Sequence, residues 1–214
     1  MKLLLVRHGE TDWNAARRFQ GHTDIPLNQR GQRQAEAVAR ILEAECIDRV
    51  HTSDLARACD TATPIALTAG CPIEADCRWR EIDFGAWEGL TYGEIQLRDP
   101  EDLAAWQTNP NQTAPPGGET LEQVTHRVKL AWRDIWVERS DCARVLVAHG
   151  GPLRLCLCLA LGLTPASHWQ FALAPGSISE LNVFESGAIL TRLNDTHHLR
   201  EASDGGESPH GSRQ

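Results

Sequence analysis

Two short apolar runs, each leading to a histidine and a glycine, constrain the fold of this chain most. The first, 3–6 (LLLV), leads to His8, and the second, 144–148 (RVLVA), leads to His149. Continuous apolar runs of this length are typical of strands that are buried on both faces. In open α/β sheets, ligands bind at the carboxyl ends of the strands. We therefore expect the two histidines to meet at one edge of a sheet.

The segments after the first run alternate between helical and strand patterns. Residues 30–45 carry apolar side chains at helical spacing opposite a charged face. Residues 49–53 predict a strand, and residues 54–62 predict a helix that is broken near Pro64. This β-α-β-α order is the signature of the α/β class.

The segments around the second run continue the pattern. Residues 152–163 predict a helix with Pro152 in its first turn. Residues 177–195 predict a β-hairpin that turns at 185–188, because apolar side chains alternate on both sides of that turn.

Residues 81–118 differ from the rest because glycines, prolines and tryptophans are concentrated there. We expect a helical insert with long loops. Capping-box patterns predict a short helix after Thr91 and a second helix from Thr120 to Arg139. The second helix carries one apolar stripe, which is typical of a helix packed on a core.

Length and charge limit the classes of function. The 214 residues favour one domain, expected over 1–200, followed by a disordered tail over 201–214 that lacks apolar residues. A net charge of −8 disfavours nucleic acid and anionic membrane as partners. A small-molecule phosphate ester is the expected partner, and a homodimer is left open.

The cysteines are odd in number and irregular in spacing, which fits neither a disulfide framework nor a zinc site. We expect a reducing compartment. The apolar run at the start of the chain is too short for a signal peptide, so the expected location is the cytoplasm. No stretch is long enough to span a bilayer. The cysteines are Cys46, Cys59, Cys71, Cys77, Cys142, Cys156 and Cys158.

The residues at the two strand ends suit phosphate chemistry. A neutral imidazole at His8 is able to attack a phosphoryl group whose charge Arg7 stabilises. His149 and Arg57 would add positive groups to the same edge of an otherwise acidic chain. This chemistry needs no metal ion or cofactor. From spacing alone, an ordinary surface pair of Arg7 and His8 remains the alternative.

Five segments resemble the motifs of the histidine phosphatase superfamily, which is also called phosphoglycerate-mutase-like. In chain order they are 4–14 (LLVRHGETDWN), 20–21 (QG), 53–57 (SDLAR), 81–85 (EIDFG) and 147–150 (VAHG). The resemblance extends over about residues 1–195. It implies a three-layer α/β/α sandwich around a mostly parallel mixed sheet, with the insert over the active site.

The resemblance also implies a role for each site residue. His8 would be the phosphorylated nucleophile. Glu81 would be the proton donor and acceptor, since an alkoxide leaving group needs a proton and the attacking water must lose one. The residues that would hold the phosphoryl group are Arg7, Arg57 and His149, and those that would line the same pocket are Asn14, Gln20, Gly21 and Gly150.

The charge of the insert favours a monophosphate ester with a weakly charged remainder. Between residues 81 and 120 the only cation is Arg98, against eight acidic residues. These charges would repel a second phosphate, which disfavours a mutase or bisphosphatase. Arg17 and Arg18 would offset them if they faced inward.

Segments 81–90, 115–120 and 193–199 and the surroundings of Trp106 resemble α-ribazole phosphatases of cobalamin nucleotide-loop assembly. Trp87 and Trp106 would either stack on the benzimidazole of α-ribazole 5′-phosphate or pack the insert. We expect a phosphomonoesterase for this ester. The alternatives are a broad-specificity phosphatase or mutase for sugar and glycerate phosphates, and a phosphate-binding protein without turnover.

Overall fold

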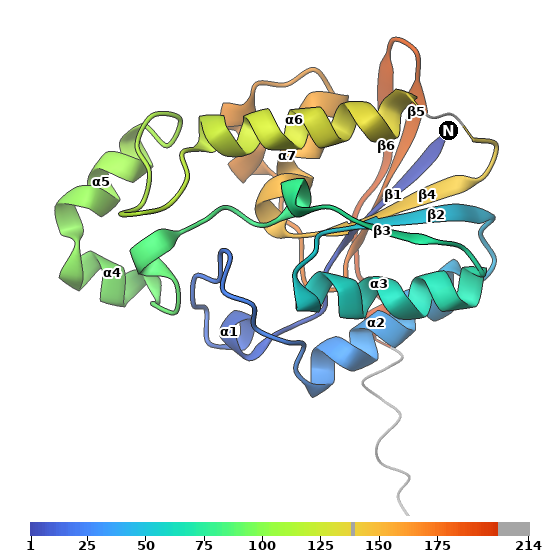
Figure 1. Ribbon diagram of the computed structural model, residues 1–214, viewed down its shortest axis with the longest axis horizontal. Helices are drawn as coiled ribbons and strands as arrows, with labels where there is room; N and C mark the ends of the chain where they lie inside the picture. The colour runs from blue at the N-terminus through green and yellow to red at the C-terminus, as the bar shows by residue number, and fades with distance from the viewer. Residues whose placement is uncertain (138–139, 201–214) are drawn as a thin grey trace, which may run out of the picture.

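A six-stranded mixed sheet forms the centre of the protein (Figure 1). The computed structural model describes residues 1–137 and 140–200, and the strand order is β3-β2-β4-β1-β5-β6. β3, β2, β4 and β1 are parallel, whereas β5 and β6 are antiparallel additions. The predicted α/β class and mostly parallel mixed sheet are therefore confirmed. The strands are β1 (Lys2–Arg7), β2 (Ile47–Thr52), β3 (Ile73–Ala75), β4 (Ala143–Ala148), β5 (Ile178–Phe184) and β6 (Gly187–Asp195).

The two apolar runs are neighbouring parallel strands. β1 pairs with β4 from Leu3 opposite Arg144 to Arg7 opposite Ala148. Both strands therefore end at the same level of the sheet, and the residues that follow them emerge side by side.

Helices cover both faces of the sheet, which gives the three-layer sandwich (Figure 1). One layer holds α2 (Gln29–Leu42) and α3 (Ala56–Ala69), and the other holds α6 (Leu121–Val137) and α7 (Gly150–Ala160). Side chains of β1 alternate between two apolar clusters, because successive strand residues point to opposite faces.

Helix α3 does not break at Pro64, contrary to the sequence prediction. The helix continues to Ala69, although Pro64 has no N–H to donate. Ala62 and Ile65 on either side of the proline are buried against the sheet. This burial offsets the lost hydrogen bond, so tertiary packing outweighs the low helix propensity of proline.

The insert has a small core of its own. It contains η2 (Gly85–Trp87), α4 (Tyr92–Arg98) and α5 (Pro100–Thr108). Trp87 is fully buried and contacts Trp106 edge to face, with ring centroids 5.7 Å apart. The tryptophans therefore pack the insert, which was one of the two expected roles.

Local signals for the helix starts are confirmed. Thr91 and Glu94 form the capping box of α4, and Thr120 exchanges hydrogen bonds with Gln123 before α6. The end of the predicted α6, at 138–139, and the predicted tail, at 201–214, lie outside the described residues. The remaining short helices are α1 (Asp12–Ala15), η1 (Cys77–Trp79), η3 (Pro165–Gln170) and η4 (His197–Leu199).

Cys46 and Cys142 form a disulfide, so the prediction of unpaired cysteines is wrong for this pair. The two residues lie just before β2 and β4, which are neighbours in the sheet, and their Cα atoms are 5.0 Å apart. Their spacing in the sequence does not reveal this proximity, because it depends on the strand order. Within the described part of the chain, no helix has the length and apolar character that crossing a membrane requires.

Candidate active site

His8 and His149 face each other at the carboxyl edge of the sheet. Their ring centroids are 5.0 Å apart, and both side chains are buried. β1 and β4 deliver them because these strands end in register. The structure thus brings together the two histidines that the strand pattern places at one edge.

The imidazole of His8 is held as a neutral ring with one free lone pair. Nδ1 lies 2.7 Å from the carbonyl oxygen of Gly9. Because a carbonyl only accepts, Nδ1 carries the proton and Nε2 keeps its lone pair. Burial lowers the pKa of His8 well below 6.5, and the charges of Arg57 and Arg7 lower it further. The ring is therefore neutral at physiological pH.

Arg57 is a fully buried guanidinium that ties three parts of the site together. It donates to the carbonyl oxygens of Thr23 (2.9 Å) and Gly21 (2.8 Å) and to Nδ1 of His149 (3.2 Å). With Nδ1 accepting, Nε2 of His149 carries a proton and donates to the Ser53 hydroxyl at 2.8 Å. These bonds fix the site before any ligand arrives.

Arg7 keeps donor capacity for a ligand. One guanidinium nitrogen donates to the carbonyl oxygen of Leu173 at 2.5 Å, and the buried Nε has no hydrogen-bond partner within the described residues. Burial lowers the pKa of Arg7 to about 10, so the group remains charged at neutral pH. An unpartnered buried donor beside His8 is suited to an anionic oxygen.

Glu81, the first residue of the insert, reaches the site. The N–H groups of Gly151 and Ile82 donate to its Oε1 at 3.0 and 2.9 Å. A Cβ at position 151 would lie 2.3 Å from this oxygen, so only glycine permits the approach. Since Gly150 and Gly151 begin α7, the helix start positions the carboxyl group.

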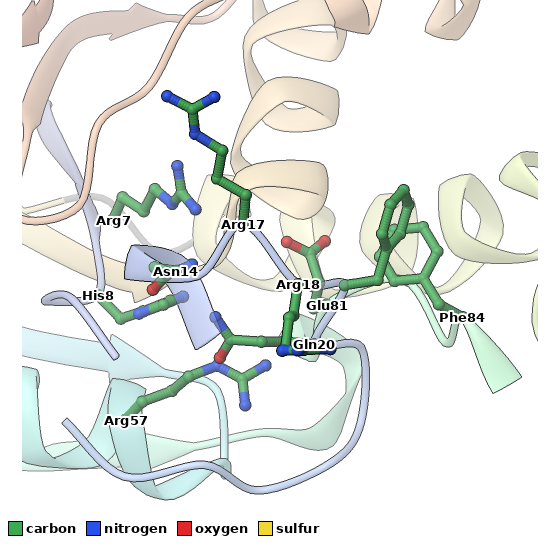
Figure 2. A pocket seen from close by; sticks show the side chains of 10 residues that line it. Arg7, His8, Asn14, Arg17, Arg18, Gln20, Arg57, Glu81 and Phe84 are labelled. Carbon is green, nitrogen blue, oxygen red and sulfur yellow. The ribbon is translucent and has the colours of Figure 1, made fainter. Parts of the chain in front are cut away.

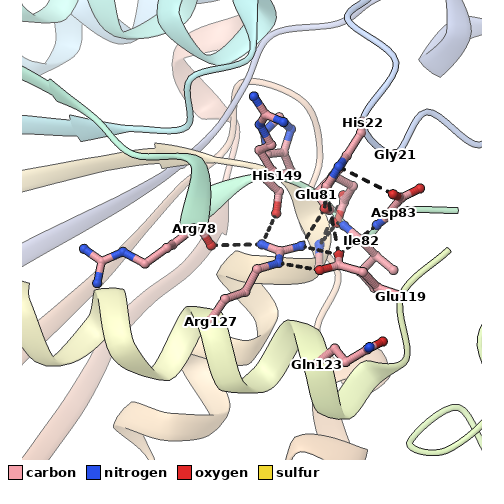
Figure 3. A network of polar contacts seen from close by, with 12 residues as sticks. Gly21, His22, Arg78, Glu81, Ile82, Asp83, Glu119, Gln123, Arg127 and His149 are labelled. Atoms are coloured by element: carbon pink, nitrogen blue, oxygen red, sulfur yellow. Dashed lines mark hydrogen bonds and ion pairs between the residues drawn. The ribbon is translucent and has the colours of Figure 1, made fainter. Parts of the chain in front are cut away.

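Arg127 of α6 anchors the main chain that carries Glu81 (Figure 3). Its guanidinium donates to the carbonyl oxygens of Arg78, Arg80 and Glu81 at 2.9, 2.6 and 2.7 Å. It also forms an ion pair with Glu119 at 2.8 Å. Arg127 has no signal in the sequence, because a cation on the polar side of a helix is ordinary.

A pocket of about 330 Å³ is bordered by Arg7, His8, Arg57 and Glu81, whereas His149 lies behind His8 and does not line it (Figure 2). Asn14 and Gln20 line it, as the family resemblance implies. Gly21 contributes its carbonyl oxygen to Arg57, and Gly150 lies against the Arg7 guanidinium. Sequence reasoning missed Phe19 and Phe84 as lining residues. The full lining is Arg7, His8, Asn14, Arg17, Arg18, Phe19, Gln20, Arg57, Glu81 and Phe84.

The count of acidic residues in the insert does not describe the charge at the pocket. Glu88, Asp99 and Glu119 accept hydrogen bonds from His22 N–H, Trp87 and Arg127. Of these, Glu119 is neutralised by Arg127 and Asp99 by Arg98, through ion pairs at 2.8 and 2.7 Å. Arg17 and Arg18 both line the pocket (Figure 2). At the pocket, Arg17 and Arg18 therefore offset the acidic charge of the insert, as the sequence allows if they face inward.

A family model, the histidine phosphatase superfamily (branch 1), matches residues 3–196. The chain belongs to this superfamily. It is 34% identical over 201 residues to phosphoserine phosphatase 1 of Hydrogenobacter thermophilus, covering 94% of this chain and 95% of that protein. It is also 34% identical over 197 residues to the adenosylcobalamin/alpha-ribazole phosphatase of Salmonella typhimurium, covering 91% and 96%.

Solved structures of histidine phosphatases share the fold. The alpha-ribazole phosphatase from Shigella flexneri superposes with a TM-score of 0.83 at 29% identity, over 91% of this chain and 96% of that one. The family and the names of these relatives support phosphatase activity. The relatives differ in the substrates that their names state.

Proposed function

We propose that this histidine phosphatase hydrolyses phosphomonoesters in two steps through a phosphorylated His8. The observation that carries the proposal is the neutral His8 ring with a free Nε2, in a pocket that Arg7 and Arg57 also line. A nucleophile with a free lone pair and cations for the developing charge are the two requirements of phosphoryl transfer.

In the first step, Nε2 of His8 attacks phosphorus, and the bond from phosphorus to the ester oxygen breaks. A protonated Glu81 gives its proton to the leaving oxygen, which departs as an alcohol. In the second step, Glu81 takes a proton from water, whose oxygen attacks the phosphohistidine. Inorganic phosphate leaves, and both His8 and protonated Glu81 are restored. Arg7 and Arg57 hold the phosphoryl oxygens in both steps.

α-Ribazole 5′-phosphate is the substrate that we propose. The support comes from the likeness to the Salmonella typhimurium and Shigella flexneri enzymes and from the resembling segments of the insert and the carboxyl-terminal region. The product would be α-ribazole, for the assembly of the cobalamin nucleotide loop.

Arg17 favours a second candidate, a phosphorylated carboxylic acid such as phosphoserine. Arg17 lines the pocket, and its guanidinium has no hydrogen bond or ion pair in the described part of the chain. The neighbouring Arg18, by contrast, donates to the Gly89 carbonyl oxygen and pairs with Glu94. A free guanidinium suits a carboxylate. The Hydrogenobacter thermophilus relative is named a phosphoserine phosphatase.

Phosphate release in EDTA tests both candidates. The substrates are α-ribazole 5′-phosphate, phosphoserine, 3-phosphoglycerate and sugar monophosphates, ranked by kcat/KM for the wild type and for His8→Ala. A large, His8-dependent preference for the ribazole ester supports the first candidate. A preference for phosphoserine that Arg17→Gln removes, and that Arg33→Gln on the exposed side of α2 does not, supports the second. Release that persists in His8→Ala refutes the mechanism.

A further inference from the structure

A second cavity, of about 270 Å³, adjoins the catalytic pocket. Its walls come from the insert, from the start of α6 and from η3. They are mostly apolar, and the apolar residues that form them are Ile82, Trp106, Pro110, Leu121 and Trp169. The mechanism proposed above uses none of them.

Two observations place this cavity beside the leaving-group side of the pocket. Glu81 lines the catalytic pocket, and the next residue, Ile82, lines the second cavity. Phe84 of the first contacts Trp106 of the second, with ring centroids 6.3 Å apart. Since Glu81 protonates the leaving oxygen, the group attached to that oxygen starts next to Ile82.

Trp169 is the exposed wall of the cavity. The indole is 71% exposed, whereas Trp79 and Trp87 are almost fully buried. An indole that packs on no core offers a flat face for stacking. Its position on η3, directly after α7, places that face opposite the insert.

The polar groups of the cavity carry no free charge. Glu119 is paired with Arg127. His168 donates from Nδ1 to the carbonyl oxygen of Pro165 at 3.0 Å, and burial, followed by the charge of Arg154, lowers its pKa, so the ring is neutral. Its Nε2 is then an acceptor. Such a lining suits an uncharged ring better than a second anion.

We infer that this cavity binds a flat, uncharged ring of the leaving alcohol, stacked on Trp169, while the phosphoryl group lies at His8. The inference rests on the proposed phosphatase reaction and narrows its substrate class to phosphomonoesters whose alcohol carries an aromatic ring.

A matched pair of substrates tests it. α-Ribazole 5′-phosphate and ribose 5-phosphate share the phosphorylated ribose and differ in the benzimidazole. We expect Trp169→Ala to lower kcat/KM for the ribazole ester about tenfold, mainly through KM, because stacking of one base contributes this much. The rate for ribose 5-phosphate should stay within about twofold, and Trp169→Phe should restore most of the loss. Phe184→Ala, an exposed aromatic at the end of β5, should change neither rate.

Binding of the dephosphorylated product separates this inference from the proposed reaction. Calorimetry with α-ribazole should show weaker binding to Trp169→Ala than to the wild type. Equal binding, or equal losses for both esters, would overturn the ring site even if hydrolysis proceeds. If neither ester is hydrolysed, the proposed reaction is refuted. The calorimetry with α-ribazole would still test the ring site in that case.

Discussion

Replacing Gly151 with alanine tests the placement of Glu81 without removing its carboxyl group. The new Cβ would lie 2.3 Å from Oε1 of Glu81 and 2.9 Å from Cγ1 of Ile82, whereas ordinary contacts begin at 3.4 Å. The backbone of α7 is fixed by its own hydrogen bonds and by burial against the sheet. The Glu81 side chain must therefore give way by about 1 Å.

The expected loss is about 100-fold in kcat, because misplacing a catalytic group by about 1 Å has this effect. It corresponds to about 2.7 kcal/mol of transition-state stabilisation. The clash falls on Glu81 and Ile82, and the arginines that would hold the phosphoryl group are outside it. KM should therefore change less than kcat.

Steady-state hydrolysis and thermal unfolding together measure this effect. Gly93→Ala is the matched control, because a Cβ there meets nothing within 4 Å. Glu81→Gln alone should slow the reaction about 10²–10⁴-fold. Gly151→Ala should lower kcat much less in the Glu81→Gln variant than in the wild type, because both substitutions act through the same carboxyl group. A folded Gly151→Ala variant with kcat within twofold of the wild type would refute the reasoning.

Four further outcomes follow. Quenching with substrate should trap an acid-labile phosphoprotein in the wild type and none in His8→Ala, and a label retained by the variant would contradict the role of His8. Burial lowers the pKa of His8 and of His149 in the folded protein. Below about pH 6.5 the two histidines therefore bind protons in the unfolded chain but stay neutral in the folded protein. The free energy of unfolding should therefore be highest above that pH and should fall as the pH is lowered further. Equal denaturant midpoints at pH 7.5 and 5.5 would contradict this expectation. Cys46→Ser should lower the free energy of unfolding by about 2–4 kcal/mol. It should leave kcat unchanged, because the disulfide joins the amino ends of β2 and β4, opposite the site. Hydrolysis should be as fast in EDTA as without it, and a loss that Mg²⁺ restores would indicate a metal ion.

The meeting of His8 and His149 follows from the sequence because it depends on two local patterns. Each histidine follows a short apolar run, and parallel neighbouring strands end at one edge of a sheet. The capping boxes of α4 and α6 are local in the same way. Glu81 has no such local signal, and the family resemblance alone placed it in the site.

The features that sequence reasoning missed depend on contacts between distant segments. The Cys46–Cys142 bond requires the neighbourhood of β2 and β4. The unbroken α3 requires the sheet on which Ala62 and Ile65, on either side of Pro64, pack. The electrostatic effect of the insert requires knowledge of each carboxylate's partner, which a count of charges does not contain.

Glu88 connects the insert to the loop that forms the phosphate pocket. Its carboxylate accepts the N–H groups of His22 and Thr23 at 2.7 Å each and that of Phe84 at 3.2 Å. Gly21 has a φ of +56° and lies so close that a Cβ there would collide with this carboxylate. The structure of the insert and that of the 20–24 loop therefore depend on each other. A graft of residues 81–120 from a relative would need to bring both a carboxylate at position 88 and a 20–24 loop that matches it, or the exchange of specificity would also disturb the phosphate pocket.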